Sequence, residues 1–300
     1  MSDSITFGLN VLGPMEVSVG GRPVVIGAQQ TRTVLAVLTI GAGSVVPVSR
    51  LVDALWPERP PRTAVLKVQG HISALRKLFR LAAGEPAAAA LITRQPGYQL
   101  DGATVRSDVH DFTELVDRAS AADNPHDAAG LLGRALRRWR GPAFADIPAG
   151  EVRRHAERLD QLRMLVAEDK AALELRRGRP LAVLEDLGPV VDADPLRERA
   201  RELLIRAYLG LGQRHAALAC YEAGRVQLRK ELGINPCSAL QRLAAGIRDG
   251  DPAQPGHPAR PGHPAQPAQP GPASTRPAKP GDPAQPSLRS TRPVSRAAGR

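Results

Sequence analysis

The residues best suited to chemistry in this sequence are basic side chains that lack acidic neighbours. Between Arg62 and Arg80 there are five lysines and arginines and no aspartate or glutamate. A solvated surface helix normally mixes both signs, because opposite charges four residues apart stabilise it by roughly a few tenths of a kcal/mol. A run of one sign gives up this stabilisation and suits a polyanion, such as the phosphate-lined major groove of DNA. The alternative is an ordinary basic surface helix in an arginine-rich chain.

Helical spacing separates this run into a buried face and an exposed face. At about 100° per residue, the apolar side chains fall on one stripe that we expect to be buried: Val65, Val68, Ile72, Leu75 and Phe79. Gly70, Ser73 and Lys77 point the opposite way, so we expect them to enter the groove. The flanks carry the other polar residues: Gln69, Arg76 and Arg80 on one side, and Lys67 on the other.

A short hairpin is predicted over residues 91–100. Pro96-Gly97 suits the two central positions of a type II turn between two strands. Arg94 precedes that turn, where it would face the minor groove or the flanking phosphates, whereas taken alone it is more simply an ordinary surface arginine. Helix and hairpin together predict these DNA-binding residues: Arg62, Thr63, Lys67, Gln69, Gly70, Ser73, Arg76, Lys77, Arg80 and Arg94.

Gly70 has a further meaning in the middle of a helix. Glycine there costs about 1 kcal/mol relative to alanine. Such a glycine marks a close approach of the backbone to another body, which is either DNA or a neighbouring helix.

The elements that position these residues begin with a sheet. Apolar residues alternate over 5–11 and again over 15–19, and a Gly-Gly turn then leads to Val24-Val25-Ile26. This period of two predicts a small antiparallel sheet.

Three helices are expected between the sheet and the hairpin. They run over 29–40, from an N-cap at Ser49 to Trp56, and from Arg62 to about Leu81, followed by the linker AGEPAAAA. Sheet, helices and terminal hairpin indicate an α+β winged helix-turn-helix.

From residue 108 to 247 no strand pattern is present and an internal repeat appears. Leu175, Gly178, Leu184 and Leu187 recur 34 residues later as Leu209, Gly212, Leu218 and Tyr221. This is the tetratricopeptide period, so we expect stacked helix hairpins in an all-α domain. The segment WRGPAFADIP should interrupt the stacking, because of its prolines and glycine.

Charge and composition divide the chain into three parts. Residues 1–106 carry eleven basic and six acidic side chains, residues 107–248 carry twenty-three and twenty-one, and residues 249–300 carry seven and three. The last part has thirteen of the 28 prolines and little apolar surface. We therefore predict a DNA-binding domain over 1–106, a helical domain over 107–248 and a disordered tail over 249–300.

Other function classes are disfavoured. No apolar run has the length of a membrane span, and the N-terminus lacks the pattern of a signal peptide, so a cytoplasmic chain without a membrane partner is expected. Cys220 and Cys237 form no CxxC pair, and the seven histidines lie outside any HExxH motif. We expect no enzyme activity, metal or cofactor.

Several segments, taken in order, resemble a known family. They include LNVLGPMEV, LVDALWP, HISALRK, PGYQL, WRGPAFADI and ELGINPCSAL. The chain resembles the Streptomyces antibiotic regulatory proteins, which join an OmpR/PhoB-type winged helix, the effector type of two-component phosphorelays, to a bacterial transcriptional activator domain. The resemblance covers about residues 5–247.

The resemblance implies a transcriptional activator, commonly of an antibiotic or other secondary-metabolite gene cluster. It implies binding to direct repeats in promoter DNA and recruitment of RNA polymerase holoenzyme. Because one winged helix reads only a few base pairs, we expect a homodimer on the DNA. Larger relatives carry an ATPase domain, but the P-loop pattern GxxxxGK[ST] is absent here, which indicates the short form.

A helical-repeat scaffold whose winged helix binds protein is the alternative function. The acid-free run from Arg62 to Arg80 favours DNA, because a protein scaffold does not need it.

Overall fold

The computed structural model describes residues 7–250. The predicted tail therefore lies outside the described residues, apart from Asp249 and Gly250.

A four-stranded sheet opens the fold. β1 (Phe7–Asn10) pairs antiparallel with β2 (Glu16–Val19), which pairs with β3 (Arg22–Pro23), while β7 (Val105–Ser107) lies parallel to β1 on the other side. The predicted strand over Val24 to Ile26 is wrong: β3 ends at Pro23, and Val25 is 85% exposed. The sequence did not indicate β7, because a three-residue strand is too short for an alternating pattern.

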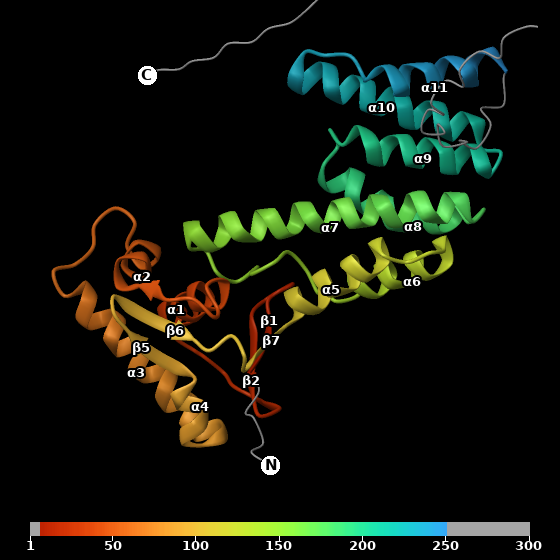
Figure 1. Ribbon diagram of the computed structural model, residues 1–300. Coiled ribbons are helices and arrows are strands. Elements are labelled where there is room, and N and C mark those ends of the chain that lie inside the picture. The colour runs from red at the N-terminus through yellow and green to blue at the C-terminus, as the bar shows by residue number, and fades with distance from the viewer. Residues whose placement is uncertain (1–6, 251–300) are drawn as a thin grey trace, which may run out of the picture. The chain divides into compact units, whose positions relative to one another are not determined.

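The winged helix-turn-helix is confirmed. α1 (Gln29–Ile40), α2 (Val48–Leu55) and α3 (Ala64–Ala83) pack together, and α3 also contacts β2. The hairpin of β5 (Leu91–Arg94) and β6 (Gly97–Leu100) forms a second sheet with β4 (Val46–Pro47), in the order β4-β6-β5. Figure 1 shows this hairpin along α3, in orange.

Two local expectations around the hairpin are wrong. The expected linker contains a short helix, α4 (Glu85–Ala89), because Ala87 and Ala88 are buried in the core and Pro86 in the first turn favours a helix start. The turn is centred on Gln95-Pro96, joined by a cis peptide bond, and not on Pro96-Gly97. Gly97 already belongs to β6, where a Cβ atom would lie 1.9 Å from the carbonyl oxygen of Val46.

From residue 108 to 250 the described chain contains helices and no strand, as predicted. Its elements are α5 (Asp108–Ser120), α6 (Pro125–Leu136), α7 (Gly150–Arg176), α8 (Pro180–Ala193), α9 (Glu198–Gly210), α10 (Arg214–Leu232) and α11 (Ser238–Asp249). Figure 1 shows successive helices stacked side by side, from yellow to blue.

The 34-residue repeat places the same glycine turn after α7 and again after α9. Gly178 N donates to Leu175 O at 3.0 Å, and Gly212 N donates to Leu209 O at 2.9 Å. Both glycines have positive φ, 68° and 72°, a conformation that favours glycine. The hairpins α7–α8 and α9–α10 therefore turn in the same way, and the predicted tetratricopeptide-like stacking is confirmed.

Residues 11–15 after β1 are bound by polar groups from the helical region. The carboxylate of Asp108 accepts hydrogen bonds from Val11 N at 2.8 Å and Leu12 N at 3.0 Å. In the segment after α6, Arg140 N donates to Leu12 O at 2.7 Å. Further along that segment, the carboxylate of Asp146 accepts from Met15 N at 2.8 Å and pairs with Arg32 of α1. We call these contacts of Asp108, Arg140 and Asp146 the clamp.

The clamp gives the WRGPAFADIP segment a role that its prolines alone did not indicate. It does interrupt the stacking, since no helix covers residues 139–149. Its main-chain groups complete the hydrogen bonding of residues 11–15, and Phe144 and Trp139 are buried in the same core as Phe7. One hydrophobic core thus runs from Phe7 to Leu173.

Asp108 should be the most sensitive polar residue of the clamp. Burial raises the pKa of its carboxyl, against the hydrogen bonds from Val11 and Leu12, which lower it. Asp108→Ala would leave two buried N–H groups without an acceptor, at a cost of about 1–3 kcal/mol each. We expect a marked fall in the denaturant midpoint of the full chain. Asp117→Ala, an exposed carboxylate on the same helix, should change stability by less than about 0.5 kcal/mol. Equal midpoints for the two variants would contradict this role.

Candidate DNA-binding surface

The inner face of α3 holds the helix in place. Val68, Ile72, Leu75 and Phe79 are at most 1% exposed, and the rings of Phe79 and Phe7 meet edge to face with centroids 4.8 Å apart. The prediction that Val65 is buried is wrong, because its side chain is 51% exposed. In the first turn of α3 the inward position is taken by Ala64 instead.

Most of the predicted DNA-binding residues lie on the exposed outer face of α3, opposite the buried stripe, or next to it. Nine of the ten are exposed: Arg62, Thr63, Lys67, Gln69, Gly70, Ser73, Lys77, Arg80 and Arg94. Arg62 and Thr63 precede α3, and Arg94 ends β5. Within residues 7–250, Arg62, Lys77 and Arg94 form no ion pair and no side-chain hydrogen bond. These three charges are therefore available to a polyanion.

Two basic residues of α3 have partners within the chain. Arg80 forms a two-pronged ion pair with Glu85 at the start of α4, including an Nη2 to Oε1 hydrogen bond of 3.0 Å. Lys67 places its Nζ over the ring of Trp56, 5.7 Å from the centroid. The acid-free run therefore meets an acidic side chain at its C-terminal end, and Trp56 is a supporting residue that the sequence did not indicate.

Arg76 is partly buried and forms hydrogen bonds with β5 of the β5–β6 hairpin, which is the wing of the winged helix. Its Nε donates to Leu91 O at 3.0 Å, and its Nη2 donates to Leu91 O at 2.6 Å and to Thr93 Oγ1 at 2.8 Å. The sequence places this guanidinium among the predicted DNA-binding residues. Its hydrogen bonds to β5 instead indicate that it fixes the hairpin beside α3.

Gly70 lies on the outer face with open space beside it. A Cβ atom at this position would meet no atom of the described chain within 4 Å. Of the two explanations for this glycine, a neighbouring helix is therefore excluded for residues 7–250.

His71 joins α3 to α1 and was not among the predicted site residues. Its Nδ1 lies 3.0 Å from Thr31 Oγ1. Burial, together with the charge of Lys67, lowers the pKa of His71 and so favours the neutral form of the ring. This hydrogen bond joins α1 and α3 next to the outer face.

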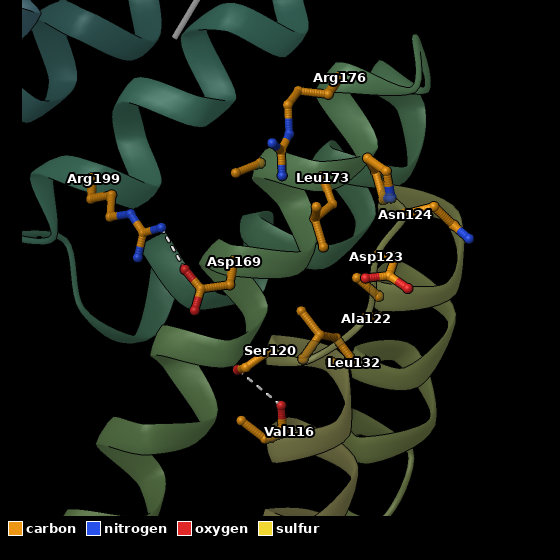
Figure 2. Close-up of a pocket in the computed structure, with 14 residues that line it drawn as sticks. Val116, Ser120, Ala122, Asp123, Asn124, Leu132, Asp169, Leu173, Arg176 and Arg199 are labelled. Atoms are coloured by element: carbon orange, nitrogen blue, oxygen red, sulfur yellow. Dashed lines mark hydrogen bonds and ion pairs between the residues drawn. The ribbon is translucent and has the colours of Figure 1, made fainter. Parts of the chain in front are cut away.

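The helical region has a groove of its own. A hollow of about 420 Å³ lies between α5, α6 and α7, and Arg199 of α9 borders it. Figure 2 shows Val116, Leu132 and Leu173 along the groove, and Arg199 paired with Asp169 at 2.5 Å.

Comparison with known proteins identifies the family. Residues 107–248 match the model of the bacterial transcriptional activator domain. The chain is 32% identical to Regulatory protein DnrI of Streptomyces peucetius, over 81% of this chain and 93% of DnrI. The chain belongs to the Streptomyces antibiotic regulatory protein family. It is also 33% identical to Regulatory protein AfsR of Streptomyces coelicolor, of which it spans 25%.

A solved structure of similar sequence has the same fold. The structure of Mycobacterium tuberculosis EmbR in complex with low affinity phosphopeptide aligns with a TM-score of 0.74 and 32% identity. The alignment covers 84% of this chain and 67% of the EmbR chain. As a member of the Streptomyces antibiotic regulatory protein family, the chain is a transcriptional regulator, and this family implies DNA as its partner. None of the helices in residues 7–250 has the length and apolarity to cross a membrane.

Arg76 and Lys77 are adjacent but should behave differently on substitution. Arg76→Ala removes the donors of Leu91 O, a carbonyl in a buried residue, and should lower the free energy of unfolding by about 1–3 kcal/mol. Lys77→Ala removes a side chain without a partner and should change it by less than about 0.5 kcal/mol. Denaturant unfolding measures both. Hydrogen exchange of the β5 amides should quicken in Arg76→Ala only, and unchanged exchange there would show that Arg76 does not hold the wing.

Proposed function

We propose that this chain activates transcription by binding direct repeats in promoter DNA through residues 1–106 and recruiting RNA polymerase holoenzyme through residues 107–248. The observation that carries the DNA part is the outer face of α3, where exposed side chains include lysines but no acidic group. In a helix-turn-helix this helix lies in the major groove. The regulators DnrI and AfsR, which the chain resembles along most of its length, support the same assignment.

The roles of the contact residues follow from their positions. Gly70, Ser73 and Lys77 lie opposite the buried stripe and face the base edges. Gln69, beside them, has the side chain that pairs with adenine through two hydrogen bonds. The remaining residues sit at the ends and sides of the surface and face phosphates: Arg62, Thr63, Lys67, Arg80 and Arg94.

Recruitment of polymerase rests on the helical region. Its stacked hairpins are the kind of framework that offers concave surfaces to other proteins. Its charge is close to balanced, with twenty-three basic and twenty-one acidic side chains over 107–248, so DNA does not attract it as it attracts α3. We propose a homodimer on the DNA, because one winged helix contacts few base pairs and two are needed for specific affinity at physiological salt.

Salt dependence tests the phosphate contacts. In binding titrations of the full chain on a duplex carrying its site, Arg62→Ala and Arg94→Ala should each weaken all sequences alike and reduce the salt slope by about one. Lys77→Ala should cost about 1–3 kcal/mol on the specific site and relax preference at one base pair if it contacts a base edge. Arg134→Ala, an exposed arginine of α6, serves as the control with an unchanged slope. An unchanged slope for both Arg62→Ala and Arg94→Ala would refute the assignment.

Helical phasing tests the direct repeats. Inserting about five base pairs between the repeats turns the second protomer to the opposite face of the DNA, so cooperative binding should be lost. Inserting about ten base pairs restores the face and should restore part of the cooperativity. Gel-shift titrations measure both. Equal affinity for one repeat and for two would contradict binding as a homodimer.

A further inference from the structure

A leucine occupies the outermost ridge of α3. Leu66, the third residue of the helix, is 66% exposed. Four and seven residues later come Gly70 and Ser73, and Lys77 follows at eleven, so the four residues share one line along the helix. The buried residues Val68, Ile72, Leu75 and Phe79 lie on the opposite side. Leu66 thus points where the DNA-facing residues point.

The position of Leu66 along the helix also matters. In a helix-turn-helix the N-terminal residues of the recognition helix contact base edges. Leu66 lies in this first turn, and Gly70 on the next turn has no side chain to cover it. An apolar side chain placed there can approach the floor of the groove without obstruction.

The surroundings decide which partner suits this leucine. An isolated exposed leucine is common on protein surfaces. Leu66, however, lies beside Lys67 and on the line of Lys77, within an outer face that has no acidic side chain until Glu85. A protein or lipid partner for Leu66 would have to accommodate these charges, whereas DNA attracts them.

The major groove offers one apolar group to such a side chain. Its base edges present hydrogen-bond donors and acceptors, together with the C5-methyl group of thymine. We propose that Leu66 recognises a thymine through contact with this methyl group. The inference rests on the proposed binding of α3 in the major groove, and it adds a specificity residue that has no hydrogen-bonding group.

The test removes the methyl group and the leucine separately. Sites are selected from random duplexes with the full chain and then synthesised with deoxyuridine in place of thymidine, which keeps base pairing and removes only the methyl groups. Wild type should bind the uracil duplex about fourfold more weakly for each methyl group contacted, from the transfer of one buried carbon. Leu66→Ala should lose affinity for the thymine duplex and show a smaller thymine-to-uracil ratio than wild type, because the two changes remove the same contact.

Two control variants accompany Leu66→Ala. Leu66→Met keeps an apolar side chain and should retain most of the thymine-to-uracil ratio. Leu181→Ala removes a leucine of similar exposure, 64%, from α8, and should bind both duplexes as wild type does. All variants should unfold at the wild-type denaturant midpoint, since these side chains are exposed.

The possible failures are distinguishable. If wild type binds both duplexes equally, or if Leu66→Ala keeps the full thymine-to-uracil ratio, the role of Leu66 is refuted while DNA binding stands. A lowered unfolding midpoint for Leu66→Ala would also refute it, by showing that Leu66 packs within the chain. If wild type selects no duplex at all, the proposed function fails together with this inference.

Discussion

The structure depends on the buried carboxylate of Asp108, which accepts hydrogen bonds from the main chain just after β1. After β1 the chain turns at residues 11–15, where the N–H groups of the buried residues Val11, Leu12 and Met15 have no strand to accept them. Asp108, at the start of α5, accepts two of them, and Asp146 accepts a third. Leaving a buried N–H without an acceptor costs more free energy than a typical hydrogen bond contributes to stability. The clamp therefore stabilises the turn by which the chain leaves β1.

The clamp is connected through α1 to α3, the helix proposed to lie in the major groove. Asp146 pairs with Arg32, and the preceding residue of α1, Thr31, bonds to His71 of α3. On its other side α3 is joined to the wing by Arg76. The outer face is thus presented by a helix fixed at two sides, and three of the residues proposed to meet DNA, Arg62, Lys77 and Arg94, have no side-chain partner within residues 7–250. This division explains why basic residues of one helix differ in role although their sequence context is similar.

The sequence was informative where structure follows a local period. The stripe from Val68 to Phe79 and the 34-residue repeat both follow from spacing, and both are present. Val65 was misplaced because a helical wheel continues the stripe to the helix end, where neighbours no longer cover it. The helix α4, the strand β7 and the position of the hairpin turn are short features set by burial and by pairing with distant segments. Asp108 bonds to residues 97 and 96 positions earlier, a relation that no local pattern contains.

The same long-range contacts cross the predicted domain boundary and join the two predicted domains. A division between residues 106 and 107 follows the composition and the helical repeat, yet it falls within β7 (Val105–Ser107). A fragment ending at Leu100 would lack β7, the parallel partner of β1, as well as Asp108 and Asp146. Its first sheet would keep unpaired N–H groups, and Phe7 would lose the part of the core that contains Phe112 and Phe144. Separate roles in DNA binding and activation are therefore better assigned with point substitutions on exposed faces of the full chain, where Lys77 and Leu66 can be changed without disturbing the clamp.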